Sequence, residues 1–234
     1  MKAVVIILSI IAFVACLLIG MQVGSDSHTI TDPTHPSAIS SLPPAQQRTL
    51  LVIFADNIQS ASPRLAGLWT VFYRPDVPRI EILPLYPVDA SDDLANQFSL
   101  TSDHQPSPDF LKAIQNYHFR WDGYVLADPA AVAALVDEFK GISIKGKTLN
   151  GKAAAKTLKM PWDAREEALS SEKTFGEALC KLMAKQSTDA NLKNLADGLP
   201  DKHVQIEFDL DQLSQDWIKL AGGQNHVECE FPTP

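Results

Sequence analysis

The run Thr49-Leu50-Leu51-Val52-Ile53-Phe54-Ala55 contains no charge and no turn residue. A short, continuous apolar run of this kind is typical of a strand that is buried on both faces of a sheet. Downstream of it, strand-like and helix-like patterns alternate irregularly over residues 48–234. The sequence therefore predicts one α/β domain, in which a mixed β-sheet is covered by helices on both faces.

Turn and cap residues define several of the other predicted elements. Residues 65–73 and 79–83 are predicted strands, and the short Arg74-Pro75-Asp76 segment between them indicates a hairpin. Asp128-Pro129 predicts a helix N-cap followed by proline, and Gly141 predicts the end of that helix. Residues 84–107 are polar and irregular, and they predict a long loop. Further strands are predicted at 123–127, 142–144, 204–208 and 227–231, and further helices from 108, from 150, at 164–185, at 191–199 and at 211–221.

Residues 3–23 form an uncharged apolar run at the N-terminus. As a helix, this run is roughly 30 Å long, which matches the core of a bilayer. We therefore expect residues 1–23 to be a transmembrane anchor. Two other readings stay open: a signal peptide cleaved near residues 21–25, and a lipoprotein signal acylated at Cys16.

The charges beside the apolar run predict its orientation. Lys2 precedes the run and Asp26 is the first charge after it, so we expect a single-pass protein of the cell membrane with an extracytoplasmic C-terminal domain. Residues 24–47 are rich in Pro, Ser and Thr and predict a linker.

The chain is acidic, with a formal net charge of −8. This balance argues against nucleic acid as a partner, because nucleic-acid binding depends on neutralising phosphates. An anionic ligand would need a local basic pocket. Of the three cysteines, Cys180 and Cys229 follow the linker, and an oxidising compartment would allow one disulfide between them; the sequence leaves this pairing open.

None of the common catalytic motifs occurs: there is no G-x-S-x-G, H-E-x-x-H, P-loop or G-x-G-x-x-G. Four stretches, however, are similar to the LytR–CpsA–Psr (LCP) family, whose members are membrane-anchored transferases of the bacterial envelope. The resemblance spans most of residues 48–187. The four stretches are 50–56, 122–128, 135–144 and 149–154.

The resemblance implies a domain that holds a polyprenyl-pyrophosphate lipid in a hydrophobic tunnel and passes a glycopolymer to peptidoglycan. The implied partners are the membrane, a polyprenyl lipid and an envelope glycan, and the implied cofactor is Mg²⁺. In phosphate transfer a protein does little covalent chemistry, so arginines and a metal must neutralise the leaving pyrophosphate. Arginine suits this task because its planar fork matches phosphate oxygens.

The resemblance assigns candidate pyrophosphate ligands to three positions. Arg64 matches the arginine of a family motif and is the candidate catalytic residue, but the acid expected two places later is Ala66, which puts Mg²⁺ binding in doubt. A second motif should supply an arginine and an aspartate after the third strand, where residues 83–86 have neither. Lys159 stands where the family has an arginine, and Arg165 is similar to a later arginine.

Asp56, at the end of the first strand, is the candidate metal ligand. The leading hypothesis is thus an LCP-like envelope domain that binds a polyprenyl-(pyro)phosphate lipid with weakened or lost transferase activity. One alternative is an active Mg²⁺-dependent phosphotransferase that passes a glycopolymer to peptidoglycan. The other is a non-catalytic interaction or scaffold module, which an interior filled by side chains would favour.

Overall fold

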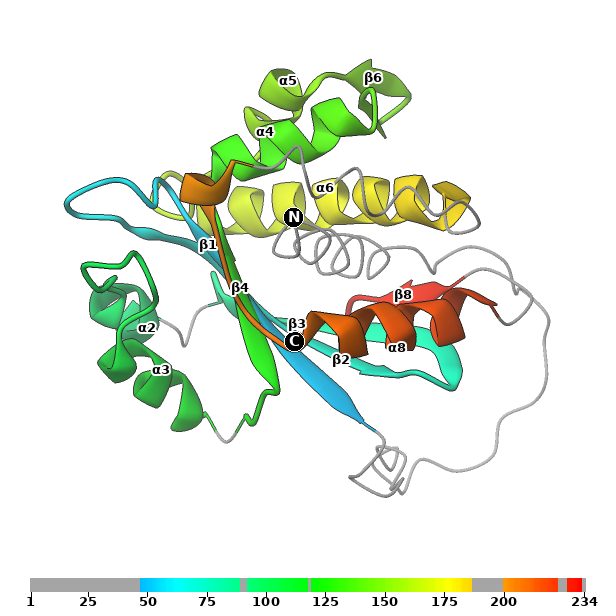
Figure 1. Ribbon diagram of the computed structural model, residues 1–234. Coiled ribbons are helices and arrows are strands. Elements are labelled where there is room, and N and C mark those ends of the chain that lie inside the picture. Colours follow the sequence, from blue (N-terminus) through cyan, green and yellow to red (C-terminus); the bar gives the residue numbers. More distant parts are fainter. Residues whose placement is uncertain (1–46, 89–91, 118, 187–199, 223–226, 233–234) are drawn as a thin grey trace, which may run out of the picture.

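The computed structural model describes residues 47–88, 92–117, 119–186, 200–222 and 227–232. A six-stranded sheet forms the centre of the domain, in the order β7-β4-β1-β2-β3-β8 (Figure 1). β1 pairs in parallel with β4 and antiparallel with β2, so the sheet is mixed, as predicted. The strands of the sheet are β1 (Arg48–Ala55), β2 (Leu65–Arg74), β3 (Val77–Tyr86), β4 (Gly123–Ala127), β7 (Val204–Glu207) and β8 (Glu228–Glu230).

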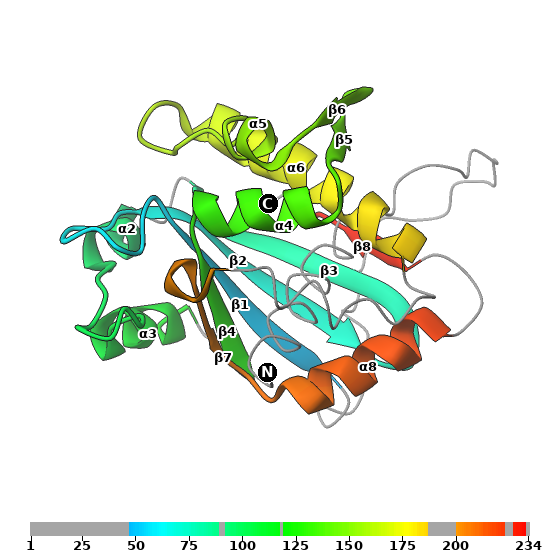
Figure 2. The same ribbon diagram turned by 45° about the horizontal axis from the view of Figure 1, so that its top comes forward.

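Alternate residues of β1 enter two separate cores. Leu50 and Val52 pack on one face, in the core that also holds buried residues of three helices: α4 (Pro129–Glu138), α6 (Arg165–Gln186) and α8 (Leu210–Gly222). Leu51 and Ile53 pack on the other face, beneath α2 (Asp92–Gln97) and α3 (Pro108–Gln115). Figure 2 shows α4 and α8 crossing the same side of the sheet. The prediction of helices on both faces is confirmed.

The predicted loop at 84–107 is only partly correct. β3 continues to Tyr86, and α2 forms at Asp92–Gln97. The prediction was wrong at these positions because the prolines in this stretch favoured a loop. Pro84, which cannot donate a ladder hydrogen bond, pairs with Trp69 at a register shift, where a strand tolerates proline. A six-residue helix is also too short to show a clear apolar period.

A second, two-stranded sheet extends from the end of α4. β5 (Ile142–Ile144) was predicted, whereas its antiparallel partner β6 (Lys147–Leu149) was not. The two strands are joined by Lys145 and Gly146, which have φ values of 49° and 77°. Positive φ at both central residues is the geometry of a tight hairpin turn. α5 (Gly151–Ala155) follows and packs against α4.

A buried polar cluster docks α8 onto the sheet. Asp216 of α8 accepts hydrogen bonds from the Tyr73 hydroxyl at 3.1 Å and from Gln212 Nε2 at 2.9 Å. Arg48 Nε lies 3.5 Å from the same carboxylate. Burial and the neighbouring Asp216 charge raise the pKa of Tyr73, so its hydroxyl stays a donor. The cluster fixes α8 at the start of β1.

The N-terminal predictions fall outside the described residues. The anchor at 1–23 and nearly all of the linker at 24–47 lie there, as does the predicted helix at 191–199. Among the residues that the structure does describe, no helix is long and apolar enough to span a bilayer.

Gly123 provides a test of the pairing between β4 and β7. A Cβ atom at this position would lie 2.1 Å from the Glu207 carbonyl oxygen, so Gly123→Ala forces the two strands apart. We expect a loss of about 1–3 kcal/mol or more in the free energy of unfolding, measured by urea denaturation. Gly146→Asn is the control, because asparagine tolerates positive φ and nothing lies within 4 Å of the added Cβ. Equal stability of the two variants would contradict this packing.

Candidate functional site

An apolar pocket of about 730 Å³, counting its open side, lies between the sheet and α6. Val52 and Trp69 line it from the sheet, and Phe175 and Gly176 line it from α6. A second apolar pocket of about 390 Å³, also counting the space open to solvent, lies beneath α4 and shares Val52 and Phe175 with the first. Side chains therefore leave a hollow between the sheet and the helices on this face. Its lining suits a hydrocarbon chain.

Arg64 is held in place near one end of this pocket. Its Nε lies 3.4 Å from Asp56 Oδ2, and its backbone N–H donates to Asp56 Oδ1 at 2.8 Å. The guanidinium carbon lies 3.7 Å from the centre of the Trp162 ring, a cation–π contact. The Arg64 side chain is still 60 % exposed. A positioned but accessible guanidinium can receive an anionic group from solvent.

Tyr86 lies within electrostatic reach of both Arg64 and Arg165, although it is not among the residues that line the pocket. Burial raises the pKa of Tyr86, while the positive charges of Arg165 and Arg64 act in the opposite direction and the negative charge of Glu172 acts in the same direction. Charges influence a pKa strongly only at short range, so these four side chains share one neighbourhood. The structure thus brings together Arg64 and Arg165, two of the three predicted pyrophosphate ligands.

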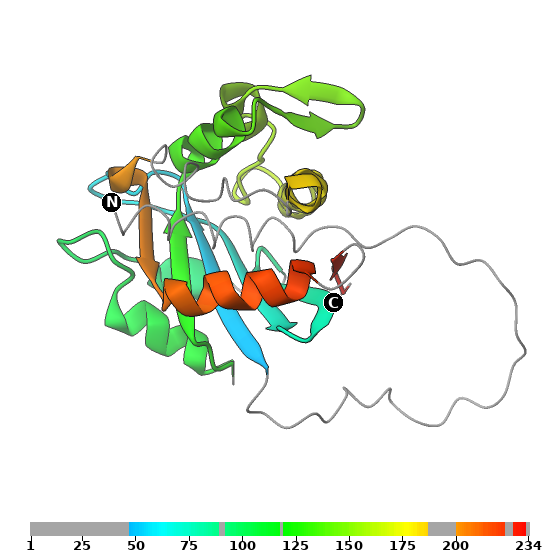
Figure 3. The same cartoon turned by 45° about the vertical axis from the view of Figure 1, so that its right-hand side comes forward.

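Lys159, the third predicted ligand, lines the pocket itself. Its backbone N–H donates to the Ser171 hydroxyl at 2.9 Å, which ties the α5–α6 connection to α6. Lys159 also ends a basic segment. Residues 139–162 contain no acid, and their six lysines are all exposed. Figure 3 shows the β5–β6 hairpin of this segment extending away from the sheet. The segment is a basic lobe on an acidic protein.

Glu172 was missed in the sequence. It lines the apolar pocket, and its Oε2 accepts a hydrogen bond from Trp69 Nε1 at 2.7 Å. Desolvation raises the pKa of Glu172 well above its ordinary value, and the Trp69 hydrogen bond offsets this only in part. A signal existed: Glu172 is half-buried and lies on the face of α6 that carries the buried Ala168 and Phe175.

The residues present fit a magnesium ion poorly. Both Asp56 oxygens are already engaged: Oδ1 accepts from the backbone N–H groups of Asn57 and Arg64, and Oδ2 faces the Arg64 side chain. Ala66, where the resemblance expects an acid, is buried. Among the described residues, no three His, Cys, Asp or Glu side chains are grouped to hold a metal. Because Mg²⁺ keeps several waters and takes only one or two protein carboxylates, the engagement of Asp56 and the loss of the acid at Ala66 weigh more than the missing three-residue group.

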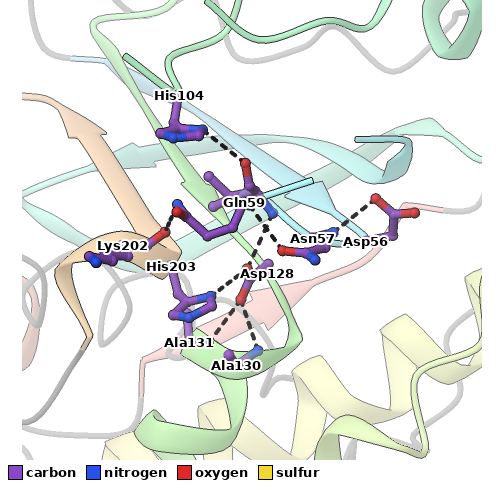
Figure 4. A network of polar contacts seen from close by, with 10 residues as sticks. Asp56, Asn57, Gln59, His104, Asp128, Ala130, Ala131, Lys202 and His203 are labelled. Atoms are coloured by element: carbon purple, nitrogen blue, oxygen red, sulfur yellow. Dashed lines mark hydrogen bonds and ion pairs between the residues drawn. The ribbon is translucent and has the colours of Figure 1, made fainter. Parts of the chain in front are cut away.

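A network centred on Asp128 positions the loop between β1 and β2, which carries Arg64 (Figure 4). Asp128 caps α4, as predicted, with Oδ1 accepting from Ala130 and Ala131. Its Oδ2 accepts from the Ile58 backbone N–H at 3.3 Å and lies 2.7 Å from His203 Nδ1. Asp128 is only 2 % exposed, so these contacts compensate a buried charge.

Two further segments hold the same loop. His104 Nδ1 donates to the Ile58 carbonyl at 3.0 Å, and Gln59 Nε2 donates to the Lys202 carbonyl at 2.7 Å (Figure 4). Contacts from the α2–α3 connection and from the start of β7 thus converge on the Arg64 loop. No signal of this convergence was visible in the sequence.

Cys180 and Cys229 both belong to the core beneath α6, where both are buried. The structure places them on the same side of the sheet, and the disulfide between them stays a prediction. Apolar packing also holds α6 against the sheet, with Phe175 and Leu179 buried.

The comparisons with known proteins concern the fold. No protein-family model matches the chain, and no curated protein matches its sequence. Solved structures do match: B. subtilis TagV has 16 % identity and a TM-score of 0.59, and the match covers 80 % of this chain and 85 % of that one.

Two further structures agree with this match. Protein gbs0355 from Streptococcus agalactiae has 10 % identity and a TM-score of 0.58, over 80 % of this chain and 77 % of that one. TagT bound to LI-WTA has 13 % identity and a TM-score of 0.54, over 83 % and 81 %. The described domain is therefore LCP-like in fold, and its sequence identity to these structures is low.

Asp128→Asn tests whether the Asp128 network holds the Arg64 loop. Asparagine keeps an oxygen for the α4 cap but presents N–H groups to Ile58 and His203, which are donors. We expect a loss of about 1.5–3 kcal/mol in the free energy of unfolding and faster amide exchange at residues 57–60. Asp109→Asn, at an exposed position in the first turn of α3, is the control and should cost less than about 1 kcal/mol. Unchanged exchange in the loop would show that Asp128 does not position it.

Proposed function

We propose that this chain is a membrane-anchored, extracytoplasmic domain of the cell envelope that binds a polyprenyl-(pyro)phosphate lipid and has weakened or lost transferase activity. The observation that carries the proposal is the apolar pocket beneath α6, which Lys159 lines, together with Arg64 and Arg165, which both act on Tyr86. A lipid of this class has the matching form, with a long hydrocarbon chain that ends in an anionic group.

The apolar half of the proposal rests on the pocket walls. Burial of hydrocarbon contributes roughly 25 cal/mol per Å², so a chain of several isoprene units gains several kcal/mol from such a pocket. The two cavities share Val52, Phe54, Phe175 and Leu179, which supports one extended binding path between the sheet and the helices. An interaction module without a lipid site would not need this space.

The proposal that the site binds the anionic group of the lipid rests on the cations near the pocket. Arg64 and Arg165 both influence Tyr86, and Lys159 lines the pocket. The exposed lysines at 139–162 extend the positive surface beyond them, where an attached anionic glycan would lie. TagT, a structure of the same fold, is bound to LI-WTA, which supports an envelope glycan as the cargo.

The proposal of weakened transferase activity rests on the residues that stand in place of two charged residues of a family motif. Leu85 and Tyr86 stand where the resemblance expects an arginine and an aspartate, and both are buried in the core beneath α2 and α3. Neither side chain can neutralise a pyrophosphate. Removal of one preorganised electrostatic group typically costs about 10²–10³ in rate, and two such groups are missing. Binding without efficient transfer is the expected result.

Arg64→Ala tests whether the site binds the anionic group of the lipid. Farnesyl pyrophosphate, a soluble short relative of the proposed lipid, should bind the full chain in nanodiscs about tenfold more weakly when Arg64 is lost, because one exposed charged contact disappears. Arg120→Ala, which removes another exposed arginine, is the matched control. If the two variants bind farnesyl pyrophosphate equally, Arg64 is not a ligand.

Gly176→Leu tests the apolar half. Gly176 lines the pocket from within α6, so a leucine at this position fills pocket space and also favours the helix by up to about 1 kcal/mol. We expect full stability in thermal unfolding and at least a tenfold loss of farnesyl pyrophosphate affinity in calorimetry. Glu177→Leu, on the partly exposed position beside it, is the control. Retained affinity in Gly176→Leu would place the lipid elsewhere.

A further inference from the structure

The apolar pocket contains an acid that the proposed lipid site does not require. Apart from Lys159, Glu172 is the one charged residue among those that line it. A carboxylate in an apolar wall opposes a hydrocarbon ligand, because the bound chain removes the water that solvates the charge. A carboxyl group at this position therefore needs an explanation other than hydrocarbon binding.

Two features of β2 hold the Glu172 carboxyl group in one orientation. A Cβ atom at Gly67 would lie 3.1 Å from both oxygens of the Glu172 carboxyl group. The absence of a side chain at Gly67 therefore leaves room for this carboxyl group beside β2. Trp69 Nε1 donates to Oε2. Within the described residues no group donates to Oε1, which is left to the pocket that Glu172 lines.

Among the described residues, no cation pairs with this carboxyl group. Lys159 lines the same pocket from the α5–α6 connection, yet the raised pKa of Glu172 arises from desolvation and is lowered only by the Trp69 hydrogen bond. The Glu172 charge acts on Tyr86 of β3, whose pKa is raised mainly by burial. Arg64 and Arg165 act on Tyr86 at the same end of the pocket. Bound hydrocarbon would desolvate Glu172 further and so favour its neutral form.

We propose that Glu172 is a ligand-contacting residue that, as the neutral acid, donates a hydrogen bond from Oε1 to an oxygen atom of the pocket-bound lipid, so that the lipid binds with uptake of a proton. The ligand class is an apolar chain with an oxygen at its polar end. The inference rests on the proposed lipid site and assigns to it a polar contact and a proton linkage.

The probe is farnesol, an isoprenoid alcohol that does not itself titrate. Its binding to the full chain in nanodiscs is measured by calorimetry between pH 5 and 9, in two buffers of different ionisation enthalpy, which counts the protons taken up. Empty nanodiscs and the Gly176→Leu chain correct for partitioning. Affinity should fall as pH rises through the pKa of Glu172 in the free protein, by up to tenfold per pH unit.

Three variants separate this role from a structural one. Glu172→Gln keeps a donor and should bind farnesol at every pH as tightly as the unmodified chain does at low pH, without proton uptake. Trp69→Phe removes the hydrogen bond to Oε2 that favours the ionised form, so the midpoint of the pH profile should move up. Glu172→Leu should lose affinity for farnesol by about two- to tenfold, but not for the oxygen-free hydrocarbon farnesene.

The outcomes distinguish this inference from the proposed function. Binding of farnesol and farnesyl pyrophosphate without proton uptake, or an unchanged pH profile in Glu172→Gln, overturns the role of Glu172 and leaves the lipid site standing. Failure of both probes to bind at any pH overturns the lipid site and this inference together.

Discussion

The burial of β1 on both faces is the constraint on which the rest of the domain depends. Its alternate side chains supply one core beneath α2 and α3 and another beneath α4, α6 and α8. Because the strand cannot face water on either side, helices must cover both faces, and the chain crosses from one to the other several times. The same strand also begins the site: Val52 and Phe54 form pocket wall, and Asp56, directly after the strand ends, holds Arg64.

Charge is distributed unevenly around this frame. The chain is acidic overall, yet its basic segment from residue 139 to residue 162 ends at the pocket, and Arg64 and Arg165 lie near the same end. Because the net charge of the chain is negative, the binding of an anionic ligand requires a local basic surface of this kind. The opposite case is Glu172, an acid in an apolar wall that pairs with no cation among the described residues, so that desolvation raises its pKa and favours the neutral form.

Periodicity and turn chemistry were sufficient to predict the β2–β3 hairpin and the Asp128 cap, because each depends on neighbouring residues, and the irregular alternation of strand and helix patterns predicted the mixed sheet. β6 and α2 were missed, since three- and six-residue elements show no clear period. Arg64 and Arg165, which the resemblance proposed as ligands, both act on Tyr86, and their role as pyrophosphate ligands stays a prediction. The Asp128 contacts to Ile58 and His203 join residues 70 and 75 positions apart, and no local pattern encodes such contacts. Glu172 could have been found, as a charge on the buried face of α6.

The most direct test of the account is photo-crosslinking of the full chain with a diazirine-bearing polyprenyl pyrophosphate, followed by mass-spectrometric mapping of the labelled residues. The central claim is that the hydrocarbon chain lies between the sheet and α6. The account predicts labels on β1 and on α6 near Phe175 and Leu179, removed by excess unlabelled lipid. Labels confined to α2, α3 or the outer surface, or no competable labels at all, would contradict it.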